Sequence, residues 1–552
     1  MFVSDQTYTR NGKTYRKTFL AESYREDGKV KQRILYNLSH ATESEKDAIK
    51  FALKYKNDLE FLRQFAAGTC QADKIAGCVL VLDHVMKKLG IDKILSPLGD
   101  YAPMAQWLIM ERLIENGSRL SAVRLAQSHY ACEILKIPTL QEDDLYKTLS
   151  ILHANKEIVE KKLFRHWQKA QKRNAEESLF LYDVSSSYFE GECNELAAYG
   201  YNRDKKIGKM QVVYGLLTDS DGNPVGIEVF PGNTVDTKTV ATQIDKIKSQ
   251  YGCKQVTLVG DKGMIKGPQI DELAIEGYHY ITTITKPQIE KLLQDKVLQI
   301  DLFDSELGEV CDFESKIRYI FRRNPQRQKE MKECRQKKID ALQKKLDTSN
   351  LYLKDHAKAT TMRQLTLLEA AIKKIKLEAV IFVTEKDRVL SLIINENNLG
   401  ELSKLDGTYV MKTDLALSVA DKETIHSRYK ALAEVEKAFR VSKSELCARP
   451  IYLRKKDRTV AHFTIVMFAY AVEKYLENAW KEIETTVSGG IEKLKSIVGL
   501  KFTLGDNTQI KIAQPNNECQ ELLDTLGFSL PTTLNFDPVL VVSRHKLAKL
   551  RK

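Results

Sequence analysis

The sequence predicts a multidomain protein with an α/β core, in which a small β hairpin element and a helical domain precede the core. Three observations lead to this fold class. Strand-forming residues with hairpin turn signals fill the first fifty positions, a helical period follows, and strands separated by a helix then appear. A chain of 552 residues is too long for one ordinary core, and its 43% hydrophobic content is ample for globular folding.

Residues 1–50 are expected to form a basic β hairpin element. The dipeptides Asn11-Gly12 and Asp27-Gly28 are typical of hairpin turns. Each separates short runs rich in Tyr, Thr, Val and Ile, which are the residues that favour strands. The basic residues in these runs make the element a candidate for contact with a polyanion.

Residues 51–175 are expected to form a helical domain. Apolar side chains recur there at three- and four-residue spacing, with Gly or Pro between the runs. Two interpretations of this domain stay open. It can contact DNA through a helix-turn-helix, or it can be an all-α packing module.

Residues 176–275 and 415–485 are expected to form the α/β core. The runs "LFLYDV", "KMQVVYGLLTD" and "NPVGIEVF" have the composition of strands and can form an antiparallel meander. A helical run, "DTKTVATQIDKIKSQYG", separates them from a fourth strand, "QVTLVGD". A helix between two strands allows the fourth strand to lie parallel beside the first.

The segment between the two parts of the core, residues 276–414, is expected to be a mainly β insertion. Short strand-like runs in it flank a charged helical pair from about 327 to 376. Residues 486–552 are expected to form a C-terminal region with a small β-like part and the basic tail "SRHKLAKLRK".

Charge and composition narrow the classes of protein. The 86 Lys and Arg against 74 Asp and Glu leave a net charge of +12, which makes nucleic acid a reasonable partner. The chain lacks the apolar stretch of a signal peptide and any run long enough to span a bilayer, so a cytoplasmic protein without a membrane partner is expected. The nine cysteines are scattered singly, which argues against a zinc site.

Two aspartates follow apolar strand runs. Asp183 follows "LFLY" and Asp261 follows "VTLVG". If the two strands are adjacent and parallel, both carboxylates emerge at the same end of the sheet, where open α/β sheets place their sites. Two such carboxylates can flank a pair of Mg²⁺ ions about 3.5 to 4 Å apart. Either aspartate alone is more often a turn or cap residue.

Glu436 is the third candidate carboxylate. In a helix expected at 425–446, Tyr429, Glu436 and Lys443 recur every seven residues and therefore share one stripe. Three converging carboxylates repel one another unless cations neutralise them, so their convergence favours a metal site. The alternatives are a solvated helix charge and a coiled-coil seam. Eight Lys and Arg against two acids follow before position 460, and phosphates could lie on that surface.

The motifs resemble a known family, the bacterial insertion-sequence transposases of the DDE type with a Y-R-E-K signature, the IS-four type. "YDVSSSYFEG" resembles the first catalytic Asp motif of that family, "FPGNTVDTKT" its G-N-x-x-D segment, and "LVGDKGM" its second Asp motif. The resemblance covers residues 179–475 and, more weakly, the N-terminal hairpin.

The signature itself matches with one departure. "YKALAEVEKAFRVSK" has the Tyr, Glu and Lys of the signature, but Leu432 stands where the family has Arg. The DNA contact made by that Arg is therefore lost or supplied from elsewhere, and Arg428 and Lys430 are the substitutes that the sequence offers.

The resemblance implies a ribonuclease H-like catalytic core, interrupted by the insertion between the second Asp and the Glu. It implies two Mg²⁺ ions per active site, for which Mn²⁺ can substitute. The implied catalytic residues and metal ligands are Asp183, Asp261 and Glu436. The implied DNA-binding residues are Tyr429, Lys443, Arg440, Lys262, Asn233 and Thr234.

The implied function is DNA transposition by a metal-dependent endonuclease and polynucleotidyl transferase. Water hydrolyses a phosphodiester at each element end, and the freed 3′-OH attacks target DNA. The partners would be the terminal inverted repeats and the target DNA, bound on the bacterial nucleoid by a synaptic homodimer or larger assembly, with end recognition mainly in residues 1–150. The alternatives are a ribonuclease H-like nuclease without strand transfer and a catalytically inactive DNA-binding protein derived from a transposase.

Overall fold

The computed structural model describes residues 1–10, 13–58, 69–171, 177–299, 303, 307–312, 314–504, 507–534 and 540–541. The chain divides into two compact units, which we call the terminal unit and the core unit. The terminal unit comprises Met1–His84, Val123–Leu140 and Ala479–Lys552, and the core unit comprises Val85–Ala122 and Gln141–Asn478.

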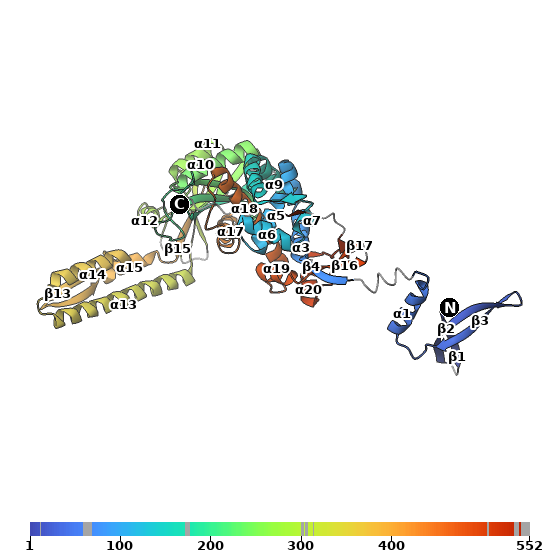
Figure 1. The fold of residues 1–552 in the computed structure, drawn as a ribbon. Coiled ribbons are helices and arrows are strands. Elements are labelled where there is room, and N and C mark those ends of the chain that lie inside the picture. Colours follow the sequence, from blue (N-terminus) through green and yellow to red (C-terminus); the bar gives the residue numbers. More distant parts are fainter. Residues whose placement is uncertain are drawn as a thin grey trace, which may run out of the picture. The chain divides into compact units, whose positions relative to one another are not determined.

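The terminal unit begins with a three-stranded antiparallel sheet in which β2 lies between β1 and β3 (Figure 1). Asp27 and Gly28 join β2 to β3, and their φ angles of 51° and 76° fit the mirror-image turn that matches strand twist. The turn predicted at this dipeptide is therefore confirmed, whereas Asn11-Gly12 lies outside the described residues. The strands are β1 (Phe2–Arg10), β2 (Lys13–Glu26) and β3 (Lys29–Asn37).

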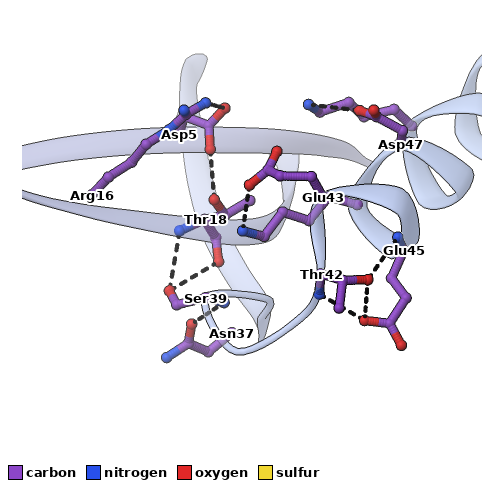
Figure 2. Close-up of polar contacts among 11 residues, drawn as sticks. Asp5, Arg16, Thr18, Asn37, Ser39, Thr42, Glu43, Glu45 and Asp47 are labelled. Atoms are coloured by element: carbon purple, nitrogen blue, oxygen red, sulfur yellow. Dashed lines mark hydrogen bonds and ion pairs between the residues drawn. The ribbon is translucent and has the colours of Figure 1, made fainter. Parts of the chain in front are cut away.

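Helix α1 (Glu43–Lys54) follows this sheet, and Figure 2 shows the polar contacts where the two meet. The Thr18 amide of β2 donates to Ser39 Oγ at 3.1 Å, which fixes the chain between β3 and α1. α1 starts with a capping box. In it, Thr42 Oγ1 accepts a hydrogen bond from the Glu45 amide, and the Glu45 carboxylate accepts one from the Thr42 amide.

The rest of the terminal unit combines distant parts of the sequence. Strand β4 pairs antiparallel with β16 and completes a four-stranded sheet of order β18-β17-β16-β4. These strands agree with the β-like part expected within residues 486–552, but the basic tail, 542–552, lies outside the described residues. The elements are β4 (Thr69–Ile75), α7 (Ala131–Leu135), β5 (Thr139–Leu140), α19 (Val487–Leu494), β16 (Val498–Leu504), β17 (Asn507–Ile512), α20 (Asn517–Leu526), β18 (Thr533–Leu534) and β19 (Leu540–Val541).

The core unit is built on an eight-stranded mixed sheet of order β11-β12-β15-β10-β9-β6-β7-β8. β6, β7 and β8 form an antiparallel meander, and β9 lies parallel beside β6, as the sequence predicted. β10 lies parallel to β9. The strands are β6 (Glu177–Tyr188), β7 (Gln211–Asp219), β8 (Pro224–Pro231), β9 (Gln255–Val259), β10 (His279–Thr283), β11 (Gly308–Asp312), β12 (Ile317–Arg323) and β15 (Thr408–Thr413).

Helices cover both faces of this sheet. One face packs its apolar side chains, such as Phe180 and Tyr182 of β6, against Phe164 of α9 (Lys156–Ala170) and Val240 of α10 (Asp236–Lys246). On the other face, the ring of Tyr214 contacts Phe439 of α17 and Phe463 of α18, with centroid distances of 5.3 and 4.4 Å. The remaining covering helices are α11 (Gly267–Ile275), α17 (Leu432–Ser444) and α18 (Lys456–Ala479).

The expected mainly β insertion is wrong for residues 276–414. β10, β11, β12 and β15 extend the core sheet, because they find pairing partners at its open edge. Residues 324–407, the inserted segment, leave that sheet between β12 and β15, and helices dominate them. The predicted charged helical pair is confirmed: α13 has 31 residues and α14 has 15, against six for each strand of the hairpin β13-β14. The elements are α13 (Pro325–Asp355), α14 (Thr361–Ile375), β13 (Ile381–Lys386), β14 (Val389–Ile394) and α15 (Glu396–Lys404).

The helices expected within residues 51–175 are present but belong to both units. The assignment of 51–175 to one end-binding domain therefore stays a prediction. No helix among the described residues is long and apolar enough to cross a membrane. Besides those already named, the helices within residues 51–175 are α3 (Gly77–Lys88), α4 (Ile91–Ile94), η1 (Ser96–Tyr101), α5 (Ala102–Ile114), α6 (Arg119–Ser128) and α8 (Glu142–Ala154). The remaining helices of the core unit are η2 (Ile247–Tyr251), α12 (Lys286–Gln294) and α16 (Lys422–Lys430).

Candidate active site

Asp183 and Asp261 follow two neighbouring parallel strands at matching positions. The ladder between β6 and β9 ends with the pair Leu181 and Val259, and each aspartate comes two residues later. Parallel strands advance in step, so this register brings both carboxylates to one edge of the sheet. This is the arrangement that the strand pattern predicted.

One detail of that prediction is wrong, because Asp183 does not end its strand. β6 continues to Tyr188, since the buried serines at 185–187 extend its ladder with β7. Asp261 does lie outside its strand, in a turn where its carbonyl accepts a hydrogen bond from the Met264 amide at 2.9 Å. The site therefore combines one residue held inside the sheet with one on a turn beyond it.

Helix α17 covers the face of the sheet on which Asp183 lies. Asp183 pairs with Leu216 of β7, and Tyr214, two residues away, points to the same side. Tyr214 packs on Phe439 of α17, which places α17 over this face. Glu436 precedes Phe439 by three residues, about one helical turn, and its side chain is exposed.

The single helix expected at 425–446 is two helices. α16 ends at Lys430 and α17 starts at Leu432. Between them the Glu434 amide donates to the Ala431 carbonyl, three residues back, in a tighter turn than the α-helical one. Tyr429 therefore does not share a continuous helical stripe with the residues of α17.

The three carboxylates nevertheless influence one another. The pKa of Asp183 is raised to about 7, mainly by burial and in smaller part by the negative charges of Asp261 and Glu436. A hydrogen bond from the Val184 amide to Asp183 Oδ1, at 2.8 Å, and the positive charge of Arg203 act in the opposite direction. Asp183 thus lies in a half-buried site with two other acids near it.

Tyr429 lies close to the same acids. Its hydroxyl forms a hydrogen bond of 3.1 Å with Thr283 Oγ1 of β10. Burial raises the pKa of Tyr429 to about 12, and the charges of Asp261, Glu436 and Asp183 contribute to this rise. The phenol therefore stays protonated at neutral pH and can donate a hydrogen bond to an anion.

Asn233 and Thr234 line a pocket of about 390 Å³, together with Gly263, Lys266 and an oppositely charged pair that the sequence did not predict. These are Arg203 and Asp236, whose side chains form an ion pair of 2.6 Å. Asp236 belongs to the G-N-x-x-D segment, so the motif contained the signal. Arg203 lies in an irregular loop, where no periodic pattern indicated it.

Lys443 is already engaged within the protein. Its ammonium lies 3.0 Å from Asp204 Oδ1, and its side chain is 11% exposed. Arg449 donates to the same carboxylate oxygen, and the Asp204 side chain is 2% exposed. Burial lowers the pKa of Lys443, and Asp204 opposes that effect. Two cations share one carboxylate, so the cluster keeps a net positive charge.

The remaining predicted DNA-binding residues, Arg440 of α17 and Lys262 beside Asp261, are exposed. Within the described ranges, no group of three or more His, Cys, Asp or Glu is placed to hold a metal ion. The donor set still fits a hard divalent cation. Carboxylate oxygens are its preferred ligands, and a cation relieves the repulsion recorded in the pKa of Asp183.

Comparison with known proteins identifies the family. A model described as the transposase DDE domain matches residues 174–472, more than half of the 552-residue chain. The chain belongs to the DDE transposase family. A second model, described as the N-terminal domain of IS1634 family transposases, matches residues 5–61. Both matches agree with the resemblance found in the sequence, and membership of this transposase family implies an enzyme that depends on a divalent metal and acts on DNA.

The other two comparisons gave one negative result and a set of structural matches. Comparison with curated proteins found no match. Six chains of solved structures match. One is the cryo-EM structure of the piggyBac transposase synaptic complex with hairpin DNA, at 9% sequence identity and a TM-score of 0.34. The match covers 72% of this DDE transposase and 70% of that chain.

Proposed function

We propose that this transposase cleaves the ends of an insertion sequence and joins the freed 3′-OH to target DNA. The observation that carries the proposal is the electrostatic convergence of Asp183, Asp261 and Glu436 at one edge of the core sheet. These three residues come from a strand, the turn after a second strand, and a helix, which are far apart in the sequence. Carboxylates that lie close together repel one another, and such clusters are typical of catalytic metal sites.

Asp183, Asp261 and Glu436 would hold two Mg²⁺ ions, with Mn²⁺ as a substitute. Bound there, the ions would supply Lewis acidity and lower the pKa of the attacking water. The protein would fix the geometry, because Asp183 lies within a paired strand and accepts the Val184 amide. The strand order β8-β7-β6-β9-β10 supports a ribonuclease H-like core.

The residues around the acids would position the scissile strand. Tyr429 would donate its phenolic hydrogen to a phosphate near the cut. Asn233 and Thr234 would contact the strand from the pocket that they line. Arg440 and Lys262 are exposed cations that suit backbone phosphates.

Lys443 would attract DNA through long-range charge rather than through a direct phosphate contact. Because it already pairs with Asp204, it would contribute mainly by the net positive charge of the cluster that it forms with Arg449. That cluster would attract a phosphate without a direct contact from the Lys443 ammonium.

The partners of the reaction would be the two terminal inverted repeats and the target DNA. Pairing two ends requires a homodimer or a larger synaptic complex. End recognition would lie mainly in residues 1–150, ahead of the catalytic strands. Binding to the bacterial nucleoid would follow from these DNA contacts.

The test is cleavage of duplex DNA that carries the ends flanking this gene. Asp183→Ala, Asp261→Ala and Glu436→Ala should each abolish Mg²⁺-dependent cutting and leave end binding largely intact. Asp245→Ala, which removes an exposed carboxylate from α10, is the matched control and should cut normally. A triad variant that cuts at a near-normal rate would remove that residue from the site.

A strand-transfer assay separates the proposal from its rivals. Joined products between cut ends and a target plasmid identify a transposase. Cutting without joining identifies a ribonuclease H-like nuclease that uses the same acids. Binding without cutting identifies an inactive DNA-binding derivative.

A further inference from the structure

The alternation of side chains separates the charges of the N-terminal sheet. All ion pairs among its described residues lie on one face, which we call the acidic face. In β1 and β2, Asp5 pairs with Arg16 at 2.8 Å. In β2 and β3, Glu22 pairs with Arg33 at 2.5 Å, and these two residues are directly opposite each other. Glu26 likewise pairs with Lys31 at 2.6 Å. The cations on this face are therefore largely neutralised.

Helix α1 lies towards the acidic face. Figure 2 shows Asp5, Arg16 and Thr18 beside the start of this helix. Hydrogen bonds from Arg16 and Thr18 lower the pKa of Asp5 to about 2, and Lys50 of α1 also lowers it. The pKa of Arg16 is raised by Asp5 and, more weakly, by Glu43 of α1. Glu43, in the first turn of α1, and Lys50, further along the helix, thus both act on this side of the sheet.

The opposite face, which we call the open face, carries cations without acids. Directly opposite residues of an antiparallel pair share a face, so Gln6 lies beside Lys17 and Ser23 beside Gln32. The only other acid between residues 2 and 37, Asp27, lies in the turn. The exposed polar and basic side chains of this face are Gln6, Tyr8, Lys17, Ser23, Arg25 and Gln32.

Lys17 and Arg25 differ from the cations of the acidic face. In the described part of the chain, neither of them forms an ion pair with a carboxylate. The Lys17 ammonium lies 5.1 Å from the centre of the Tyr8 ring, which leaves its positive charge uncompensated. An exposed sheet face with two uncompensated cations is electrostatically complementary to a polyanion.

We propose that the open face binds in a groove of duplex DNA at the element ends. This inference rests on the proposed function and names the surface by which the transposase recognises its ends. Two- and three-stranded sheets fit the major groove, which is about 12 Å wide. Lys17 and Arg25 are eight positions apart on β2, or about 26 Å at 3.3 Å per residue. With the strand lying along the groove, they would therefore reach phosphates at two separate points of the DNA backbone.

The other side chains of the open face would read the bases. The amides of Gln6 and Gln32 can each donate and accept a hydrogen bond, as recognition of an adenine edge requires. Ile34, 56% exposed, pairs with Ala21 across the strands and could contact a thymine methyl group. Phosphate contacts would thus give affinity, and the amides would give sequence preference.

The test uses the full chain and two duplexes of equal length, one from the ends flanking this gene and one of random sequence. Lys17→Ala/Arg25→Ala should weaken binding to both duplexes at least tenfold and reduce the salt slope of log K by up to about two. The matched control is Lys31→Ala/Arg33→Ala, which removes the same number of cations from the acidic face of the same sheet. It should change binding less than twofold, since those cations are already paired.

A further double variant separates the contribution of base contacts to binding from the contribution of charge. Gln6→Ala/Gln32→Ala should reduce the preference for end DNA over random DNA at least tenfold, with an unchanged salt slope. Circular dichroism of each variant must match the wild type.

Wild-type binding by the open-face variants, or an equal loss in the Lys31 and Arg33 control, would overturn this inference and leave the proposed function intact. A wild-type chain that neither binds nor cuts DNA from the flanking ends would overturn the proposed function itself.

Discussion

The raised pKa of Asp183 predicts that metal binding depends on pH near neutrality. With a pKa of about 7, half of the metal-free molecules hold a proton on Asp183 at pH 7. A divalent cation binds the ionised carboxylate, so it must displace that proton. The ionised fraction falls from about 0.9 at pH 8 to about 0.1 at pH 6. The apparent affinity for Mn²⁺ or Mg²⁺ should therefore fall about tenfold over this range.

Isothermal titration calorimetry in buffers of different ionisation enthalpy measures both the affinity for the metal and the number of protons released on binding. About half a proton should be released per site at pH 7, and almost none at pH 8.5. Asp183→Asn removes the titrating group, so its weaker metal binding should be nearly independent of pH between 6 and 8. Glu436→Gln removes one repelling charge and should shift the midpoint to lower pH. Equal affinity at pH 6 and pH 8, without proton release, would refute the reasoning.

The same shift has a consequence for the stability of the metal-free protein. The pKa of Asp183 is raised in the folded state above the value of about 3.9 in an unfolded chain. Its contribution to stability is therefore fully present below about pH 4 and is lost as the pH rises through 7. In chelator, the melting temperature of the wild type relative to Asp183→Asn should fall across that window.

Three further predictions concern the surroundings of the acids. Asp204→Ala leaves Lys443 and Arg449 without their shared carboxylate, and should reduce the free energy of unfolding by about 2–4 kcal/mol in a denaturant titration; a loss under 0.5 kcal/mol would show that the pairing is weak. Lys443→Ala should slow single-turnover cleavage at saturating protein and reduce the salt slope of binding by at most about one; full recovery of the rate would make it a binding residue only. Tyr429→Phe removes the hydrogen bond to Thr283 and should reduce the free energy of unfolding by about 1 kcal/mol. It should also slow cleavage at every pH, and a normal cleavage rate would exclude the phosphate contact.

Part of the candidate site could be predicted from the sequence because the strand pattern is a local signal. The apolar runs before Asp183 and Asp261, with a helix between them, were enough to place both carboxylates at one edge of the sheet. The continuation of β6 past Asp183 was not predictable in this way. Serines have little preference for strands, and those at 185–187 are held there by pairing with β7 and by burial.

Other parts were missed for identifiable reasons. Helix α1 was signalled by Thr42 and Glu45, which fit the S/T-x-x-E capping pattern but precede a weakly apolar run. β12 and β15 join the core sheet through partners distant in the sequence, which no local pattern encodes, and β11 joins it through β12. The break between α16 and α17 contains neither Gly nor Pro, so nothing in the sequence marked it.

The way in which the inserted segment leaves the sheet makes it separable. β12 and β15 are adjacent antiparallel strands, and their ladder ends with the pair Arg323 and Thr408. The Asn324 amide donates to the Gly407 carbonyl at 2.9 Å, so the chain enters and leaves the inserted segment at neighbouring residues. A two-residue turn could therefore replace residues 324–407 and close an ordinary β hairpin. The segment is thus a module that can be exchanged or deleted without a change in the register of the strands beneath the active site.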